Sequence, residues 1–270
     1  MCGIVGQVEL RGIVDHDLLV AMRDTLEHRG PDDAGSWLSA DGRVGLGHRR
    51  LSFLDLSSAA HQPMPSEDER LWLTLNGEIY NHRELRRLLE ARGHRFRSAC
   101  DAEVVLHGYE EWGPAVLERL SGMFAFGLWD ERAQELFLAR DRFGIKPLYY
   151  FADGDRLLFA SEAKALLAHR EVPREVDWSA ACDYLVYRYV PSPKCIWKGL
   201  AKLPPASWLR LGRDGAVTVR EYWRLPPGDR QLPFDDAVAA VDAQLESAVR
   251  RHLESDVALG SFLSGGYDSS

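Results

Sequence analysis

A cysteine stands directly after the initiator methionine in the opening stretch MCGIVGQVEL. If Met1 is removed, Cys2 becomes N-terminal, and its thiol and a free α-amine belong to one residue. The thiolate is the nucleophilic form of cysteine, and an α-amine with a pKa near 7.7–8.0 can serve as its base. Gly3 allows other backbone to approach closely. Cys2 is therefore a candidate nucleophile, although a cysteine at position 2 also arises by chance.

The stretch LNGEIYN places Asn76 before Gly77 and has two interpretations. Asn-Gly between strands is the strongest short signal for a hairpin turn, and a turn alone has no chemical role. Alternatively, the Asn76 side-chain amide and the Gly77 backbone N–H donate to a developing oxyanion, which acyl transfer requires. Both interpretations hold together if the turn is a rigid mount for the donors.

Three charged side chains are candidate ligands of a small zwitterionic substrate. Arg50, in HRRLS, has a planar guanidinium that suits a carboxylate, although a lone arginine is more often a solvated surface residue. Glu78 and Asp101 are candidate partners of an ammonium group. Asp101 is equally suited to cap the helix predicted to follow it.

A second glycine-rich stretch, SGGYDSS, follows a short apolar run near residue 263. It lacks the lysine of a Walker A loop. Its glycines and hydroxyls would cradle a pyrophosphate at a helix N-terminus, and Asp268 would bind Mg²⁺. The alternative interpretation is a turn whose Asp or Ser caps a helix.

The elements that position these residues predict a layered α+β chain. Helices are predicted over 15–28, 81–93, 101–113 and 233–256, with Asn81 capping the second and Gly93 ending it. Strands are predicted at 3–10, 70–75, 78–81, 122–130, 135–141, 147–153, 156–162 and 257–263, and the stretch 44–56 is predicted to be a strand that enters a polar turn. Proline is frequent after residue 190, which indicates a linker.

Composition excludes several classes of protein. The chain has 270 residues with 33 basic and 41 acidic side chains, a net charge of −8 that disfavours a nucleic-acid partner. No apolar run reaches membrane-spanning length, and no signal-peptide pattern is present. The four cysteines form no C-x-x-C pair, which favours a reducing, cytoplasmic compartment.

Seven motifs occur in one order: MCGIVG, HRGPD, GHRRLSFLDLS, QPM, NGEIYNHRELR, GMFAFGLWD and ARDRFGIKPLYY. This ordered set resembles the class II glutamine amidotransferase domain, and in particular the glutaminase half of the glutamine-hydrolysing asparagine synthetase family. The resemblance implies the N-terminal-nucleophile hydrolase fold, a four-layer αββα sandwich, with loss of Met1. It also implies attack on the glutamine side-chain amide, release of ammonia and hydrolysis of a glutamyl thioester, without a cofactor.

The resemblance also implies roles for individual residues. Cys2 is the expected nucleophile and base, and Asn76 and Gly77 the expected oxyanion hole. The residues expected to bind glutamine are Arg50 at its α-carboxylate, Glu78 and Asp101 at its α-ammonium, and the backbone of Leu51, Ser52, Phe53 and Leu54, beside Asn76 and Gly77. Arg29 either shapes the loop over the site or is purely structural.

In this family a second domain uses ATP and Mg²⁺ to activate the aspartate β-carboxylate, which ammonia then attacks. The residues expected to contact ATP are Leu263, Ser264, Gly265, Gly266, Asp268 and Ser269, with Asp268 the candidate Mg²⁺ ligand. The expected division is a glutaminase domain at 2–192, a connecting segment at 193–232 and the start of the synthetase domain at 233–270. A chain ending at residue 270 is expected to lack synthetase activity.

Two departures and two alternatives accompany the resemblance. The family usually carries Leu where this chain has Tyr267, and Pro-Gly where it has Pro205-Ala206. One alternative keeps the glutaminase and changes the acceptor to another carboxylate, in polysaccharide or secondary-metabolite synthesis. The other is a non-catalytic module of the same fold. A homodimer is left open by the sequence, and no membrane partner is expected.

Overall fold

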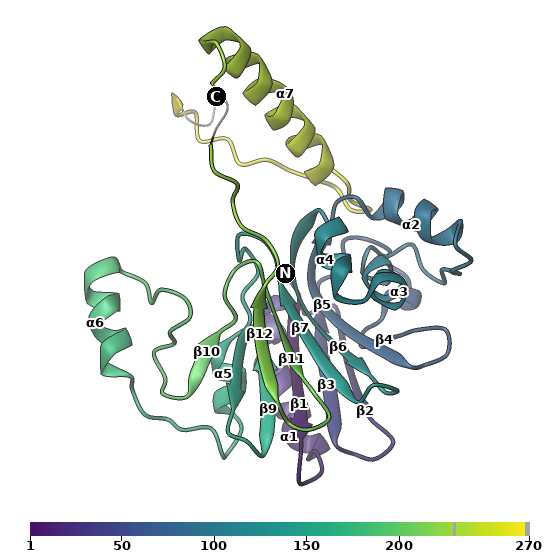
Figure 1. Cartoon of the computed structure of the whole chain (residues 1–270), viewed down its shortest axis with the longest axis vertical. Coiled ribbons are helices and arrows are strands. Elements are labelled where there is room, and N and C mark those ends of the chain that lie inside the picture. The colour runs from purple at the N-terminus through teal and green to yellow at the C-terminus, as the bar shows by residue number, and fades with distance from the viewer. Residues whose placement is uncertain (229–230, 268–270) are drawn as a thin grey trace.

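Two antiparallel sheets face each other at the centre of the molecule, with helices on their outer sides (Figure 1). The computed structural model describes residues 1–228 and 231–267. Within these residues, sheet A has the strand order β10-β8-β9-β1-β3-β2, and sheet B the order β12-β11-β7-β6-β5-β4. The predicted layered α+β arrangement is confirmed.

The bounds of the elements are as follows. The strands are β1 Gly3–Glu9, β2 Asp33–Leu38, β3 Val44–Arg50, β4 Met64–Pro65, β5 Leu71–Ile79, β6 Gly122–Asp130, β7 Glu135–Arg140, β8 Tyr149–Ala152, β9 Arg156–Ala160, β10 Leu200–Lys202, β11 Ser207–Leu211 and β12 Val217–Glu221. The α-helices are α1 His16–Asp24, α2 His82–Glu90, α3 Ala102–Trp112, α4 Val116–Arg119, α5 Ala163–Leu167, α6 Trp178–Tyr187 and α7 Phe234–His252. Short 3-10 turns are η1 Glu27–Arg29, η2 Ser58–Ala60 and η3 Gly113–Ala115.

Three apolar clusters correspond to the three interfaces of the sandwich. The cluster between the sheets contains side chains of β1, β3, β6, β7, β9 and β11. A second cluster packs α1 and α5 against sheet A, and a third packs α2, α3 and α4 against sheet B. Burial of three apolar layers is the main driving force for this fold.

The middle of sheet A is the strand that begins directly after Cys2. Every residue of β1 is buried, because the strand pairs with β3 on one side and β9 on the other. Side chains alternate along a strand, so Ile4 and Val8 enter the cluster between the sheets while Val5 packs beneath α1 and α5. Cys2 is thus fixed at the end of a rigid central strand.

The hairpin turn predicted at Asn76-Gly77 is wrong. Both residues lie inside the continuous strand β5, which pairs with β6 from Leu71 to Ile79. A Cβ atom on Gly77 would lie 2.3 Å from the Met123 carbonyl oxygen of β6. The glycine is therefore required by the close approach of a neighbouring strand, and not by a reversal of the chain.

The predicted helices are present, but the predicted Asn81 cap of α2 is not. The Asp15 carboxylate accepts from the backbone N–H of Asp17 and Leu18 at the start of α1. Asn81 precedes α2 but does not cap it with its side chain. Its side-chain amide instead donates to the Arg119 carbonyl at 2.9 Å and accepts from the Ser121 N–H at 2.9 Å, so it joins α2 to the start of β6.

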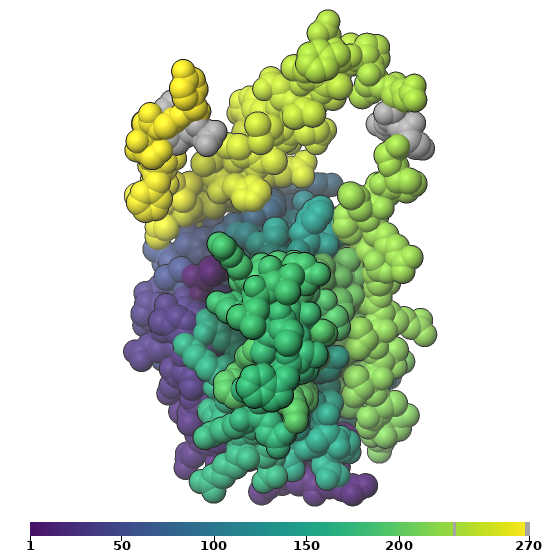
Figure 2. Space-filling view, turned by 90° about the vertical axis from the view of Figure 1, so that its left-hand side faces the viewer, coloured from purple at the N-terminus to yellow at the C-terminus, as the bar shows by residue number. Residues whose placement is uncertain are grey.

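The last part of the chain departs most from expectation. Three strands, β10 to β12, lie within the segment expected to connect two domains, and they extend both sheets. The helix predicted from residue 233 is present as α7, which lies with the residues after it across one end of the sandwich (Figure 2). The strand predicted at 257–263 is wrong, since none of the strands in the described part of the chain pairs with it. A strand without a neighbour leaves its backbone groups unpaired.

Candidate active site

Cys2 lies in a fixed and largely dry position. Its side chain is 7% exposed, and its Sγ atom lies 3.5 Å from the Leu51 backbone nitrogen, which donates to it. The Cys2 carbonyl accepts from Arg29 Nε at 2.9 Å, and the same guanidinium pairs with Glu162 at 2.9 Å. Arg29 therefore holds the backbone of the candidate nucleophile in place.

Burial raises the pKa of the Cys2 thiol, and the hydrogen bond from the Leu51 backbone acts in the opposite direction. The thiol form therefore dominates near neutral pH. A nucleophile in this state needs a base close to the sulfur atom. The α-amine exposed by loss of Met1 would lie on the same residue.

A pocket opens beside Cys2 and collects residues from distant parts of the sequence. It is lined by Cys2, Arg50, Leu51, Phe53, Leu54, Gln62, Leu75, Gly77, Cys100 and Asp101. The structure therefore brings together most of the predicted glutamine-binding residues. Ser52, Asn76 and Glu78 are not among the residues that line it.

Arg50 shapes one wall of this pocket from the end of β3. Its side chain is buried, and its guanidinium donates to the backbone carbonyls of Ser57 at 3.1 Å, Leu54 at 3.2 Å and Asp55. The interpretation of Arg50 as a solvated surface residue is wrong. These hydrogen bonds hold the loop 51–57 in a curved conformation over the pocket. The Arg50 guanidinium also places a positive charge beside the pocket.

Asp101 supplies a carboxyl group to the same pocket. It is 4% exposed, and its Oδ2 atom accepts from the Ile79 N–H at 2.7 Å. Its side chain does not cap α3, so that alternative is wrong. Burial raises the pKa of this carboxyl, and no ion pair reaches it among residues 1–228 and 231–267. A buried carboxylate without a cationic partner suits an ammonium group of a ligand.

Lys146 is a buried charge that the sequence analysis missed. Its side chain is buried, and burial lowers its pKa while the charges of Glu78 and Cys2 raise it. Burial and the charge of Asp101 in turn raise the pKa of Glu78. Lys146 lies within the motif ARDRFGIKPLYY. Its apolar neighbours in that motif were the sequence signal that could have predicted a buried lysine.

Asn76 is buried with an unpaired amide. It is 1% exposed, and neither its Nδ2 nor its Oδ1 atom has a hydrogen-bond partner among the described residues. Thr74, two residues earlier on the same face of β5, reaches His48 of sheet A at 3.1 Å. Asn76 therefore faces the space between the sheets, on the side of β5 that is turned toward sheet A. Sheet A contains β1, which begins directly after Cys2. A buried unpaired amide is costly, and such exceptions gather at functional sites.

The segment after α7 contacts the loop that covers the pocket. The Asp256 carboxylate accepts from the Asp55 N–H at 2.7 Å, and the Asp256 N–H donates to the Phe53 carbonyl at 2.9 Å. The Asp55 carboxylate accepts from the Ala99 N–H at 2.7 Å, two residues before Asp101. The loop is therefore fastened on two sides.

The expected ATP-binding residues are only partly described. Leu263, Ser264, Gly265 and Gly266 are exposed, and the Gly266 N–H donates to the Ser264 hydroxyl at 3.3 Å. Asp268 and Ser269 lie outside the described residues.

None of the described helices is long and apolar enough to cross a membrane.

Comparison with known proteins places this geometry in a class. A solved structure of glutamine phosphoribosylpyrophosphate amidotransferase from B. subtilis matches with a TM-score of 0.60 and 20% identity, over 82% of this chain and 49% of that one. A structure of the allosteric regulatory enzyme of purine biosynthesis matches with a TM-score of 0.61 and 20% identity. The predicted four-layer αββα sandwich is confirmed by this likeness of fold.

Sequence comparison then gives the family. The family model "Glutamine amidotransferase domain" matches residues 1–223, and the model "Asparagine synthase" matches residues 240–270. The chain belongs to the glutamine amidotransferase domain family, and the resemblance predicted from its ordered motifs is confirmed.

Two relatives are named asparagine synthetases, and a third is named an amidase. Asparagine synthetase [glutamine-hydrolyzing] 3 of Bacillus subtilis is 39% identical over all of this chain and 44% of its own length. Asparagine synthetase [glutamine-hydrolyzing] 2 of that organism is 36% identical, over all of this chain and 38% of its length. Amidase chry2 of Gibberella zeae is 35% identical, over 92% of this chain and 37% of its length. The chain thus spans less than half the length of these relatives.

Proposed function

We propose that this chain is the glutamine-hydrolysing part of a glutamine-dependent asparagine synthetase. The observation that carries the proposal is the pocket that joins Cys2, Arg50 and Asp101. It offers a nucleophile, a guanidinium and a carboxyl group that has no ion-pair partner among the described residues. That charge pattern complements an amino acid whose side chain extends toward the sulfur atom.

The reaction follows from the groups in place. The Cys2 thiol gives its proton to the α-amine freed by Met1 removal, and the sulfur attacks the glutamine side-chain carbonyl carbon. Asn76 Nδ2 and the Gly77 N–H stabilise the resulting oxyanion. The carbon–nitrogen bond breaks as the α-ammonium returns its proton to the leaving amine, which departs as ammonia. Water, deprotonated by the same amine, then cleaves the thioester to glutamate and regenerates the thiol.

Substrate recognition is assigned to three charges and one loop. Arg50 binds the α-carboxylate, and Asp101 with Glu78 binds the α-ammonium. The backbone of Leu51, Phe53 and Leu54 lines the pocket beside these charges, and the backbone of Ser52 is proposed to contact glutamine with them. The raised pKa of both carboxyls in the absence of a cation supports this assignment, because an ammonium ligand would restore their ionised form.

The segment 233–270 is proposed to begin an ATP-dependent domain that amidates an adenylated aspartate β-carboxylate. Asparagine, AMP and pyrophosphate are the products of that step. Residues 263–266 with Asp268 and Ser269 would contact ATP, and Asp268 would hold Mg²⁺. The match of residues 240–270 to the asparagine synthase family supports this assignment. The domain division at residues 192 and 232, a cytoplasmic location and a homodimer remain proposals.

A second candidate keeps the glutaminase and changes the acceptor carboxylate. The similarity to Amidase chry2, which does not carry the asparagine synthetase name, favours retaining it.

The test of the glutaminase is glutamate release from glutamine by the purified 270-residue chain. Intact mass of the same sample reports whether Met1 has been removed. The matched variants are Cys2→Ala and Cys182→Ala, since Cys182 is exposed and away from the pocket. Turnover lost only in C2A is expected. Absence of turnover from a folded chain that begins at Cys2 would overturn the proposal in favour of a non-catalytic module.

A further inference from the structure

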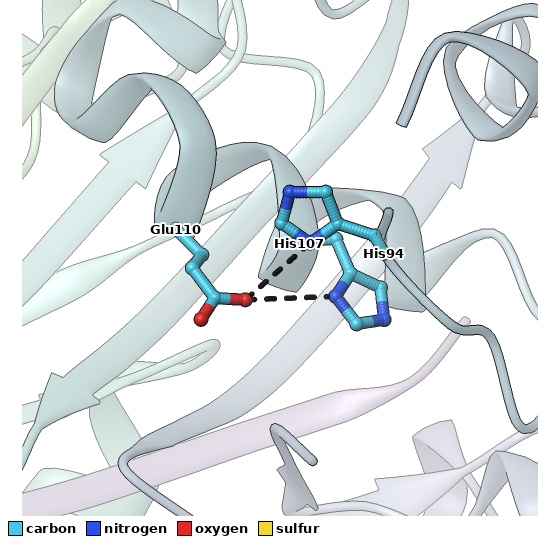
Figure 3. A group of neighbouring side chains, drawn as sticks. All are labelled: His94, His107 and Glu110. Atoms are coloured by element: carbon cyan, nitrogen blue, oxygen red, sulfur yellow. Dashed lines mark ion pairs between the residues drawn. The ribbon is translucent and has the colours of Figure 1, made fainter. Parts of the chain in front are cut away.

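A cluster of two histidines and a glutamate lies on the outer side of sheet B, apart from the residues that line the Cys2 pocket. His94 lies in the segment between α2 and α3, and His107 and Glu110 lie one turn apart on α3. One ligand atom from each of the three lies within 4.8 Å of the other two. Figure 3 shows both imidazole rings turned toward the Glu110 carboxylate.

The two distances from Glu110 to the histidines are close to those in the ligand shell of a small tetrahedral ion. Glu110 Oε2 lies 3.5 Å from His94 Nδ1 and 3.7 Å from His107 Nδ1. With metal–ligand bonds of about 2.0–2.1 Å, the ligands of a tetrahedral zinc ion lie about 3.3 Å apart. Closure by a few tenths of an ångström therefore places both contacts in range, whereas 3.7 Å is too long for a hydrogen bond.

The outer nitrogen of each ring faces a second carboxylate. His94 Nε2 lies 3.3 Å from Glu111 Oε2, and His107 Nε2 lies 3.6 Å from Glu103 Oε1. The Glu103 carboxylate is itself fixed, because it accepts from the Ser98 N–H at 2.9 Å. Histidines that bind metal usually donate their other N–H to a carboxylate, which directs the free nitrogen at the ion. The His94 ring has that arrangement, and the His107 ring faces the Glu103 carboxylate from just beyond hydrogen-bond distance.

One atom of the cluster is unexplained without a ligand. The His107 side chain is 2% exposed, and its Nδ1 atom has no hydrogen-bond partner among the described residues. Buried polar atoms are nearly always paired. The Glu110 side chain is 34% exposed, so a hydrated ion can enter from that side.

From this geometry we infer that His94, His107 and Glu110 bind a divalent transition metal, of which Zn²⁺ is the best match, with Glu103 and Glu111 as positioning residues. The two imidazole nitrogens favour Zn²⁺ over Mg²⁺ or Ca²⁺, and a carboxylate is a common third ligand of zinc. The ion would fasten the segment that carries His94 to α3, the helix that begins after Asp101. Its expected role is to stabilise this part of the fold.

The test is calorimetric titration of ZnCl₂ into the untagged, chelator-treated chain carrying Cys2→Ala, which removes the thiol as a competing ligand. One ion per chain with a dissociation constant below about 10 µM is expected. H94Q and E110Q each weaken binding at least tenfold, and E111Q weakens it by about tenfold or more. The matched controls His16→Gln and Glu118→Gln, both at exposed positions, leave the affinity unchanged.

Two readouts keep the result decisive. A hundredfold excess of Zn²⁺ over the dissociation constant raises the melting temperature of the parent by about 5 °C or more, and not that of E110Q. Co²⁺ gives tetrahedral visible bands without thiolate charge transfer. E110Q changes an exposed side chain, and its melting temperature in EDTA must match the parent. No saturable binding, or binding that persists in both H94Q and E110Q, overturns the inference.

Discussion

Replacing Asn76 by alanine separates a catalytic amide from a structural one. Asn76 is 1% exposed, and both polar atoms of its side chain lack partners in the described chain. Asn81 offers a matched control, because its amide makes two hydrogen bonds of 2.9 Å, to the Arg119 carbonyl and the Ser121 N–H. The two asparagines thus differ in what the folded protein loses.

The magnitudes follow from these contacts. Loss of one oxyanion donor lowers kcat by about 10²–10³-fold, or about 2.7–4 kcal/mol. N76A breaks no hydrogen bond and removes two buried unpaired atoms, each costing about 1–3 kcal/mol. This relief offsets the lost packing, so the unfolding free energy stays within about 1 kcal/mol of the parent or rises. N81A loses two hydrogen bonds of about 0.5–1.5 kcal/mol each and is destabilised by about 1–3 kcal/mol.

The assay is steady-state glutamate release beside urea unfolding, for the parent, N76A and N81A. We expect N76A to lose kcat with KM changed less than threefold and with stability preserved, and N81A to show the opposite pattern. A fall in kcat of less than tenfold in N76A would refute the oxyanion role. A destabilisation of N76A equal to that of N81A would refute the inference that its amide is unpaired.

Three further predictions concern charge and packing. Asp101→Asn removes a buried carboxylate, whose raised pKa makes its ionised form destabilising at pH 7. The KM for glutamine should rise about 10²–10³-fold, while the melting temperature rises about 2–4 °C. A lower melting temperature would contradict this account. Gly6→Ala puts a Cβ atom 2.2 Å from the Phe159 ring, so chemical denaturation should show a loss of about 1–3 kcal/mol that Phe159→Leu partly restores, and an unchanged midpoint would disprove the steric argument. Burial alone would raise the pKa of Asp130, but its bonds to Arg70 and to backbone N–H groups hold it below 3.8. Its stabilising effect is therefore present above the unfolded-state pKa and is lost as the pH falls through the lowered value. D130N should cost about 1.5–3 kcal/mol at pH 7 and less as the pH falls below 3.8; an equal loss at pH 7 and pH 2 would rule this out.

Local sequence was sufficient for the elements with clear periodicity, whereas β2, β4, β10 to β12 and α4 to α6 were not predicted. Periodicity and end signals agree with the final packing at the strands 122–130 and 135–140 and at the helices α2, α3 and α7, so all of these were predicted.

The departure from the family pattern at Ala206 also has a structural meaning. Its φ is 52°, a left-handed conformation that favours glycine, and the family usually carries glycine there.

Predictions failed where a distant segment decided the outcome. Asn76-Gly77 has the local chemistry of a turn, but pairing with β6 keeps β5 straight across it. Asn81 and Asp101 both stand where the sequence predicts a helix cap. The Asn81 amide and the Asp101 carboxylate instead form hydrogen bonds to backbone groups that folding brings close. The run at 257–263 has the composition of a strand, but a strand forms only where another is available to pair with it.

By itself, the sequence determined the layered fold and the candidate nucleophile, through local patterning and a set of motifs in fixed order. The tertiary structure alone decided which charges meet. Arg50, Asp101 and Cys2 come from the ends of separate elements and share one pocket, while Lys146 becomes buried near Glu78 and the Cys2 sulfur. The reason is physical: the effect of a charge depends on its burial and its neighbours, and both arise from long-range packing that no local pattern encodes.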